Sequence, residues 1–470
     1  MQNVVPGEMT PSLLSRSNHE NLPLKDMNMV MAGNVFPRKT KGQLPRAVKA
    51  EGIWITDQSG RRYIDASGGA VVVNLGHGRK EIAEAVFKQL TEGYYFHPTM
   101  FTTGAVEDLA RALVRHAPTG IGRFYFLSSG SEAVEAAVKL ARQIHLARGR
   151  PTKYKLISRW KSYHGLTLGA LAAMGRTSFR TPYAPMLPEV VHIPPPYCLR
   201  CSFGLTHPEC GMRCALALEE AIHNEGEEVV SAFLAEPVSG ATIAACPPPP
   251  GYWKLIREIC DRYQVLLIHD EVMTGMGRTG CWFAGEHYNV APDIVTLGKG
   301  LSGGSLPLSA VGVQEALFES VLGAGGFVHG GTYSHHPVAA AAGLACITIL
   351  EREGLVERAA RMGAWLGEAL RNRLAGLPTV ADVRGMGMLW GVELVRDKAG
   401  LAPYPRSERV TERVVNALFE QGVIVYGATG LAGPDGDALV IAPPFIIEKK
   451  DLKTVIEAIG RAIEQTLSSA

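Results

Sequence analysis

The chain has 470 residues, of which 46% are hydrophobic and 20% are charged, and this composition predicts a soluble globular protein with a sizeable core. Its formal net charge of +2 gives no electrostatic reason to expect a nucleic acid or a membrane surface as a partner. The sequence has no run of about 18 apolar residues, no secretory signal pattern and only eight cysteines, so we expect a cytoplasmic protein without a membrane span or a disulfide scaffold.

The first quarter of the chain predicts an arm, a hairpin and a helix. Residues 1 to about 25 are polar and lack periodicity, so we expect a loose arm or a segment that wraps a partner there. The alternation from Ile53 to Asp65 predicts a hairpin with a Ser-Gly turn. The glycine-rich stretch Ser67–Gly78 precedes a helix predicted at about residues 80–92. The aromatic-dense segment EGYYFHPTMFTT follows, and core packing is the default expectation for it.

A strand, a short turn and a helix next predict an anion site. Phe124–Leu127 has the composition of a strand, and apolar residues at helical spacing predict a helix that begins near Ser131. Ser129 and Glu132 have the spacing of a capping box. The free N–H groups and the dipole of such a helix start attract anions. An ordinary well-capped helix would have the same sequence pattern.

Four cysteines lie close together in a stretch rich in proline and glycine. They are spaced C-x2-C-x8-C-x3-C, at Cys198, Cys201, Cys210 and Cys214. Four thiolates at short spacing could hold a structural zinc ion, whereas a surface insertion with reduced thiols would need no metal. We assign no metal site, and both interpretations stay open.

Two chemically important residues each follow a predicted buried strand. Val265–Ile268 leads into Asp270, and Asp293–Leu297 leads into Lys299, which has a glycine on either side. Burial disfavours the charged form of a lysine, and a neutral amine can form a Schiff base with a carbonyl-bearing cofactor. A carboxylate could hold the pyridine nitrogen of pyridoxal phosphate (PLP) in its protonated form. Taken alone, Asp270 could instead cap a turn and Lys299 could be a solvated loop cation.

Two glycine motifs raise a different hypothesis. GMGRTG at 275–280 and GKGLSG at 298–303 match G-x-G-x-x-G and follow strands, as in a nicotinamide-binding Rossmann site. That motif should begin a helix and have an acidic residue about 20 positions further on. Neither stretch meets these conditions, so we do not favour a dehydrogenase.

Short strands and helices alternate after Lys299, which predicts a smaller α/β domain. Helices are predicted from about Pro337 to Glu351, onward to about Leu374, in the 409–421 region and from Asp451 to Gln465. Strands are predicted in VADVRGMGMLWGVELV, in GVIVYG and in ALVIAPPFII.

The stretches LLIHDEVMTGMGRTG and PDIVTLGKGLSGG resemble the aspartate and lysine motifs of class III PLP-dependent aminotransferases, and the chain is similar to the omega-transaminases among them from about Gly52 onward. This resemblance implies an α/β fold of fold type I, with a mixed, mostly parallel sheet flanked by helices and a smaller α/β domain. It implies a large PLP-binding domain at 61–335 and a small domain at 336–470, to which residues 1–60 contribute.

The resemblance also implies which residues bind the cofactor. SGSEA, SYHG, LAEPVSG and GGTYS are similar to further motifs of the family. Lys299 and Asp270 are the implied catalytic residues. A threonine of the neighbouring subunit completes the phosphate site in relatives, so a homodimer is implied. The implied cofactor-binding residues are Gly130, Ser131, Tyr163, Glu236, Asp270, Val272, Lys299 and Thr332.

The implied reaction moves an amino group from a primary amine or omega-amino donor to a keto acid, with pyruvate as the expected acceptor. A PLP-dependent decarboxylase or aminomutase of the same fold is the alternative, and a non-catalytic binding protein is a more distant one. The expected partners are these small molecules and a second subunit, without nucleic acid or membrane.

Three positions depart from the family pattern. Met273 stands where many relatives have glutamine, Val440 where many have an arginine for a substrate carboxylate, and Ala70 where many amine-active relatives have tryptophan. Without that arginine we expect a longer or bulkier primary amine as donor rather than a small α-amino acid. Arg384 and the arginines near Pro405 are candidates for holding the acceptor carboxylate.

Overall fold

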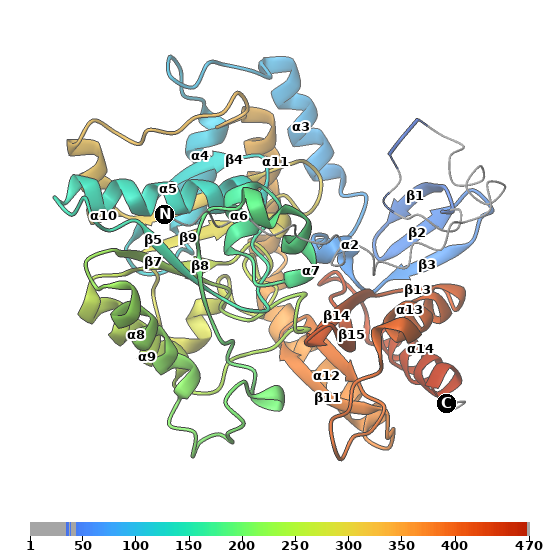
Figure 1. Ribbon diagram of the computed structural model, residues 1–470. Helices are drawn as coiled ribbons and strands as arrows, with labels where there is room; N and C mark the ends of the chain where they lie inside the picture. Colours follow the sequence, from blue (N-terminus) through green and yellow to red (C-terminus); the bar gives the residue numbers. More distant parts are fainter. Residues whose placement is uncertain (1–33, 37, 39–43, 468–470) are drawn as a thin grey trace, which may run out of the picture.

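Three β-sheets form the framework of the computed structural model, which describes residues 34–36, 38 and 44–467 (Figure 1). The predicted arm at residues 1 to about 25 lies outside the described residues. The large sheet has the order β4-β10-β9-β8-β7-β5-β6. Its strands are β4 (Ile121–Leu127), β5 (Lys155–Arg159), β6 (Val191–Ile193), β7 (Val230–Ala235), β8 (Leu266–Asp270), β9 (Ile294–Leu297) and β10 (Ser309–Gln314).

The large sheet is mixed but mostly parallel, which confirms the predicted fold class. β9, β8, β7, β5 and β6 run parallel to one another, and β10 is antiparallel to both β9 and β4. Buried parallel strands need apolar side chains on both faces, and β7 and β8 are buried along their whole length.

Helices cover both faces of this sheet. Helix α5 (Gly130–Ala147) packs on one face, and α8 (Arg213–Glu225) and α9 (Tyr252–Tyr263) pack against each other on the opposite face. Within β8, Leu266 and Ile268 belong to the core beside α5, whereas Leu267 belongs to the core beside α8 and α9. Side chains alternate between the two faces along a strand, so Asp270 at the end of β8 is on the same face of the sheet as Leu266 and Ile268.

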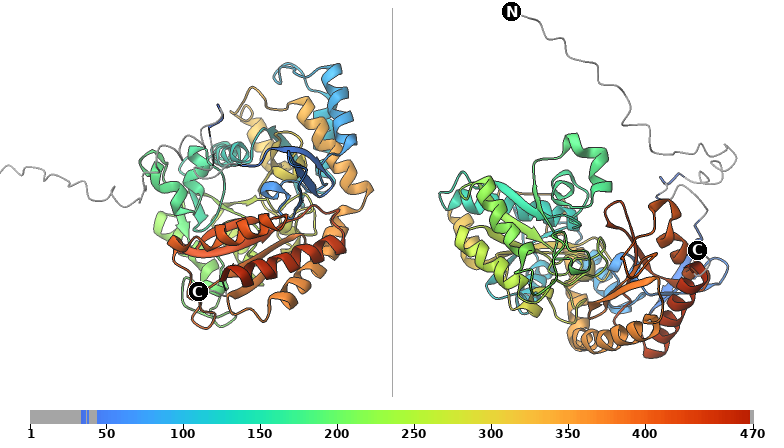
Figure 2. Two further views of the ribbon diagram at one scale, coloured as in Figure 1. Left: turned by 90° about the vertical axis from the view of Figure 1, so that its right-hand side faces the viewer. Right: turned by 60° about the horizontal axis from the view of Figure 1, so that its bottom comes forward.

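Two smaller sheets lie beside the large one, and one of them joins the two ends of the chain. β11 (Val380–Met386), β12 (Leu389–Leu394), β15 (Asp435–Ile441) and β14 (Tyr426–Ala432) form one sheet in this order. β1 (Ala47–Glu51), β2 (Trp54–Asp57), β3 (Arg62–Asp65) and β13 (Val423–Ile424) form the other. Because β13 pairs with β3, the blue amino-terminal strands lie beside the red carboxy-terminal segment (Figure 2).

The remaining long helices pack in two groups. Helix α11 (Pro337–Arg352) packs against α3 (Lys80–Glu92) and α4 (Gly104–Val114). Helix α12 (Leu355–Leu374) packs on β11 and on α14 (Lys449–Leu467), which also contacts α13 (Val410–Glu420). The predicted hairpin and the helices predicted at 80–92 and from Pro337 are confirmed. The domain boundaries at 60/61 and 335/336 stay a prediction.

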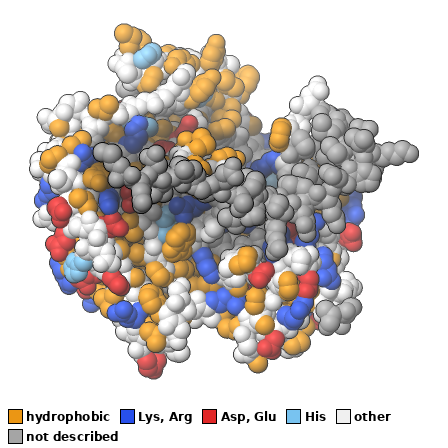
Figure 3. Space-filling model, viewed as in Figure 1, with side chains coloured by type: hydrophobic (Ala, Val, Ile, Leu, Met, Phe, Trp, Pro, Cys, Tyr) orange, Lys and Arg blue, Asp and Glu red, His pale blue; other side chains and the backbone are white. Residues whose placement is uncertain are grey.

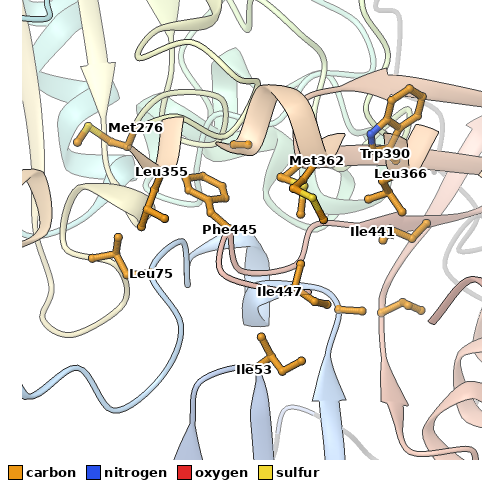
Figure 4. Packing of buried hydrophobic residues seen from close by; sticks show 14 of the residues in the cluster. Ile53, Leu75, Met276, Leu355, Met362, Leu366, Trp390, Ile441, Phe445 and Ile447 are labelled. Carbon is orange, nitrogen blue, oxygen red and sulfur yellow. The ribbon is translucent and has the colours of Figure 1, made fainter. Parts of the chain in front are cut away.

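One hydrophobic cluster contains residues from the amino-terminal hairpin, from the turn after β8 and from the carboxy-terminal segment. Figure 4 shows Phe445, Leu355 and Met276 gathered in this cluster, with Ile53 and Leu75 nearby. Each fully buried side chain of this size contributes about 1.5–3 kcal/mol. The amino-terminal hairpin, the turn after β8 and the carboxy-terminal segment are therefore stabilised by one shared core.

The described helices include none that is long and apolar enough to cross a membrane. The cytoplasmic location stays a prediction.

Candidate active site

The site lies where β8 and β9 end. Parallel strands bring their carboxyl ends to the same edge of a sheet, which is where open α/β sheets bind ligands. Asp270 is the last residue of β8, and Lys299 follows β9 after a single glycine. The Lys299 backbone has a φ of 43°, in the left-handed region that costs free energy for a residue with a Cβ. Strain of this kind is concentrated at functional sites.

Hydrogen bonds to both oxygens fix the Asp270 carboxylate. Its Oδ2 lies 2.7 Å from His164 Nδ1. Its Oδ1 accepts hydrogen bonds from the Thr296 hydroxyl and from the Val272 N–H, each at 3.1 Å. Asp270 is 4% exposed. A carboxylate held in this way keeps its orientation and can present a fixed negative charge to a ligand.

The neighbouring carboxyl group of Glu271 has a different role. Its Oε2 accepts a hydrogen bond from the Thr274 hydroxyl at 2.5 Å, and its Oε1 accepts one from the Gly285 N–H at 2.9 Å. Burial raises the pKa of Glu271 to about 7. Glu271 therefore supports the turns after β8, and Asp270 is the carboxylate of the site.

Burial also changes the acid–base behaviour of Lys299. It lowers the pKa of the Lys299 amine to about 8, although the charges of Asp270 and Glu236 act in the opposite direction. The amine therefore becomes neutral as the pH rises through about 8, where an ordinary lysine is still charged. A neutral lysine amine is a nucleophile for carbonyl groups and can also carry a proton.

The amino terminus of α5 forms the predicted anion site. Ser129 and Glu132 make the predicted capping box. Among the hydrogen bonds of the described residues, none uses the N–H group of Gly130 or Ser131. A Cβ at Gly130 would lie 2.8 Å from Val272 Cγ1, so only glycine allows this close approach. Two free N–H groups and the helix dipole favour an anion here.

The SYHG segment is held against the same helix start. The Leu166 N–H donates to Ser131 Oγ at 3.1 Å, and a Cβ at Gly165 would lie 2.9 Å from Ser131 Cα. This packing fixes the position of Tyr163, which is half-buried, and of His164, which is 3% exposed. Burial raises the pKa of the Tyr163 phenol.

Glu236 follows β7 and belongs to the same group of residues. It is 5% exposed, and its Oε1 accepts a hydrogen bond from the Gly240 N–H at 3.1 Å. Its Oε2 has no hydrogen-bond partner among the described residues. Burial raises the pKa of this carboxyl group, and the neighbouring His164 and Arg159 oppose the rise.

The structure brings seven of the eight predicted cofactor-binding residues together. These are Gly130, Ser131, Tyr163, Glu236, Asp270, Val272 and Lys299. Thr332 lies apart on an exposed segment between α10 (Glu315–Gly323) and α11. The sequence analysis missed His164 and Thr296, whose contacts with Asp270 join positions 106 and 26 residues apart. The histidine of SYHG was the available signal.

The three positions that depart from the family pattern lie in different environments. Val440 is fully buried in β15, where it pairs with Gly391 and Tyr426. Ala70 is exposed in the short α2 (Gly68–Val71), and Met273 packs beside Gly240.

Arg384 does not fit the role of a substrate-binding cation. It is 8% exposed and donates to the Ile243 carbonyl at 2.7 Å and to the Ala244 carbonyl at 3.1 Å. It also pairs with Asp382 at 2.9 Å and with Glu393 at 2.8 Å. Two carboxylates and two carbonyls already neutralise and satisfy this guanidinium, so Arg384 stabilises the structure around β11 and β12.

The structure argues against the Rossmann alternative. Residues 275–279 form turns, and Lys299–Leu301 form a single 3-10 turn, so neither motif begins an α-helix. Within the first motif, buried Arg278 donates to the carbonyls of Met388 and Pro443 at 3.0 and 2.7 Å. Arg278 therefore links this glycine motif to the segments that carry Met388 and Pro443, and the motif does not have the form of a dinucleotide site.

The cysteines of the described chain are all free thiols. Cys214 is buried, Cys201 and Cys210 are partly exposed and Cys198 is exposed. Within the residues that the structure describes, no group of three or more His, Cys, Asp or Glu residues is arranged to hold a metal ion.

The residues at this site fit PLP. An anion site suits its phosphate, a fixed carboxylate suits its pyridine nitrogen, and an amine with a lowered pKa suits its aldehyde. Gly130 leaves room beside Val272, and the buried His164 Nε2 and Glu236 Oε2 have no hydrogen-bond partner among the described residues. The fold and this site define a PLP-dependent enzyme of fold type I.

Comparisons with known proteins identify the family. The model for "Aminotransferase class-III" matches residues 36–463. Diaminobutyrate–2-oxoglutarate transaminase of Halomonas elongata is 37% identical over 96% of this chain and 97% of its own. Putrescine–pyruvate aminotransferase of Pseudomonas aeruginosa is 36% identical over 90% of this chain and 91% of its own.

A solved structure agrees with this result. The PLP-bound amine transaminase from an uncultivated Pseudomonas species has a TM-score of 0.85 and 32% identity, and the match covers 93% of this chain and 98% of that one. The chain therefore belongs to the class III aminotransferases. It is a transaminase, and its cofactor is pyridoxal 5'-phosphate.

Proposed function

We propose that this aminotransferase takes its amino group from a primary amine or an omega-amino donor and passes it to a keto acid, with pyruvate as the acceptor. The observation that carries the proposal is the group formed by Lys299, with its lowered pKa, and the fixed carboxylate of Asp270. The similarity to putrescine–pyruvate aminotransferase supports an amine donor and pyruvate as acceptor, although the diaminobutyrate relative is named for 2-oxoglutarate.

Each residue of the site has a proposed role. PLP supplies a carbonyl that condenses with amines and a ring that accepts electrons. Lys299 Nζ is the proposed nucleophile toward this carbonyl and the group that moves a proton during transfer. Asp270, oriented by His164, holds the proton on the pyridine nitrogen.

The remaining residues are proposed to bind and orient the cofactor. The N–H groups of Gly130 and Ser131 bind the phosphate. Tyr163 and Val272 pack against the ring, and Glu236 shapes the adjoining pocket.

The donor preference rests on what the site lacks. No arginine lies between Gly422 and Pro444, and buried Val440 cannot pair with a carboxylate. An unpaired carboxylate in such surroundings would cost several kcal/mol, on the order of 2–7 for a polar group without a partner. A donor without an α-carboxylate avoids this cost, whereas the keto acid brings a carboxylate that needs a cation elsewhere in the site. Nothing in the structure favours the decarboxylase or aminomutase alternative.

We propose that the enzyme works as a homodimer, in which Thr332 reaches the cofactor of the neighbouring subunit. Several of the large apolar side chains that are more than half exposed lie in two segments, at Tyr94, Met100, Phe101, Val328 and Tyr333. A hollow lined by Phe101, Phe124 and His335 connects the two segments. Figure 3 shows hydrophobic side chains on the upper part of this face. Exposed apolar surface of this kind indicates a protein interface.

Transfer of labelled nitrogen tests the proposed function. Holoenzyme is incubated with a ¹⁵N-labelled primary amine and pyruvate, and the alanine produced is analysed by mass spectrometry. We expect ¹⁵N-alanine in a one-to-one ratio with the carbonyl product of the donor. Release of CO₂ without alanine would show a decarboxylase, and an isomerised amine formed without pyruvate would show an aminomutase.

A further inference from the structure

We propose that Arg176 is the residue that holds the carboxylate of the keto-acid acceptor, in a pocket adjoining the active site. This inference rests on the proposed function. It names the cation that binds the acceptor carboxylate, because Val440 cannot pair with a carboxylate and Arg384 is already paired with Asp382 and Glu393.

A cavity of about 590 Å³ contains Arg176. This volume lies in the range typical of small-molecule sites, about 300–1,000 Å³. The cavity is bordered by the segment that precedes α7 (Thr177–Arg180), by Thr242 and by the hairpin of β14 and β15. Figure 1 shows α7 next to β14.

The walls of the cavity continue the segments of the active site. Lys161 lines the cavity and lies two residues before Tyr163. Thr242 also lines it, and lies two residues after Gly240, whose N–H donates to Glu236. The Thr242 hydroxyl donates to the Lys161 carbonyl, which joins these two walls. The cavity therefore adjoins the two segments that carry Tyr163 and Glu236.

A backbone hydrogen bond places Arg176 beside the SYHG segment, because the Gly175 N–H donates to the Ser162 carbonyl at 3.2 Å. Burial raises the pKa of the Tyr163 phenol, and the positive charges of Arg38 and Arg176 act against this rise. Burial lowers the pKa of Arg176, and Tyr426 and Tyr163 oppose that change. Arg176 and Tyr163 each follow one of the two residues that this backbone hydrogen bond joins, so Arg176 lies close to the aromatic residue proposed to pack on the cofactor.

The cavity carries a positive charge that an anion can neutralise. Its charged lining residues are Lys161, Arg176 and Arg406, and none of the described residues that line it is acidic. Lys161 Nζ donates to the Leu431 carbonyl. Arg406 makes a two-point ion pair with Glu412, so its charge is already compensated.

Arg176 differs in its partners from Arg406, the other arginine that lines the cavity. Its Nη2 donates to the Thr429 hydroxyl at 3.0 Å, and no described carboxylate lies within ion-pair distance of it. Hydroxyl groups of Thr177, Ser178 and Thr181 line the same cavity. A half-buried guanidinium without a carboxylate favours a bound anion, and its planar shape suits two hydrogen bonds to a carboxylate.

Paired acceptors test the role of Arg176. With one saturating amine donor, kcat/KM is measured for pyruvate and for acetaldehyde, which keeps the methyl group and the carbonyl of pyruvate and has a hydrogen in place of the carboxylate. For Arg176→Gln we expect kcat/KM for pyruvate to fall about 10- to 100-fold and kcat/KM for acetaldehyde to stay unchanged. Arg176→Lys should give an intermediate loss for pyruvate only.

Matched variants separate this role from a structural one. Arg409→Gln removes an exposed arginine outside the cavity and should leave both acceptors unchanged. Thr429→Val removes the partner of Arg176 and should lower the value for pyruvate alone, which keeps the test available if Arg176→Gln does not fold. Equal losses for both acceptors, or no loss for pyruvate, would overturn the inference. In either case labelled alanine made by the wild-type enzyme would leave the proposed function intact.

Discussion

His164 Nδ1 lies 2.7 Å from Asp270 Oδ2, and both side chains are buried where β8 ends. The Thr296 hydroxyl and the Val272 N–H hold the other oxygen of the carboxylate. Asp270 cannot turn without breaking three hydrogen bonds, each of which contributes about 0.5–3 kcal/mol. The site therefore contains a carboxylate whose orientation is fixed before any ligand binds.

Replacing this charge should remove most of the activity. Asp270→Asn preserves the shape of the side chain, but an amide cannot keep a pyridine nitrogen protonated. We expect the variant to retain some PLP, measured by absorbance after gel filtration, and to lose about 100-fold or more in kcat. Asp261→Asn, at an exposed position of α9, is the matched control. Turnover close to that of the wild type would show that Asp270 is not the partner of the ring.

The lowered pKa of Lys299 should control how the cofactor-free enzyme takes up PLP. The neutral amine becomes more abundant as the pH rises through the folded-state pKa of about 8, whereas an ordinary lysine would need a pH near 10.5. Stopped-flow absorbance should therefore show an uptake rate that rises through about pH 8 and then levels off. A midpoint near pH 10.5 would contradict the role of burial, and Lys299→Ala should lack this pH dependence altogether.

Local patterns in the sequence predicted much of the fold and of the cofactor site. Asp270 and Lys299 each follow a short apolar strand, and the carboxyl ends of neighbouring parallel strands meet by geometry alone. The capping box at Ser129 and Glu132 is likewise a local signal.

Contacts between distant segments could not be predicted in this way. The bond between His164 and Asp270 spans 106 residues, and that between Arg176 and Thr429 spans 253. Arg384 was a candidate for binding substrate until the structure showed its partners Ile243 and Glu393. Periodicity reports which face of an element is buried, but it does not report which side chains from other elements lie opposite.

Thr332 tests the proposed homodimer. Removing its hydroxyl should weaken a contact to the cofactor of the neighbouring subunit and leave the fold intact, because Thr332 is exposed in the single chain. We expect Thr332→Ala to lose PLP faster than the wild type during dialysis, with an unchanged thermal unfolding temperature of the cofactor-free protein. Light scattering should give the mass of a dimer for both proteins. A fully active monomer would rule out the shared site.

The choice of donor follows from the absence of an arginine near Val440. Amines are compared with glutamate when pyruvate is the acceptor and with alanine when 2-oxoglutarate is the acceptor. In both comparisons kcat/KM for a terminal amine or an amine on a secondary carbon should be the larger value. The expected reason is the cost of placing a donor carboxylate beside apolar side chains. A clear preference for glutamate would mean that a cation elsewhere in the site receives the donor carboxylate.

The absorbance of the bound cofactor during a half-reaction tests the role of Lys299 most directly. Purified holoenzyme should be yellow, should bleach when a primary amine is added without acceptor, and should recover its colour when pyruvate follows. Lys299→Ala, with PLP bound, should complete no such cycle. Bleaching and recovery in Lys299→Ala at the wild-type rate, or no bleaching of the wild type by any amine, omega-amino acid or α-amino acid, would contradict the account.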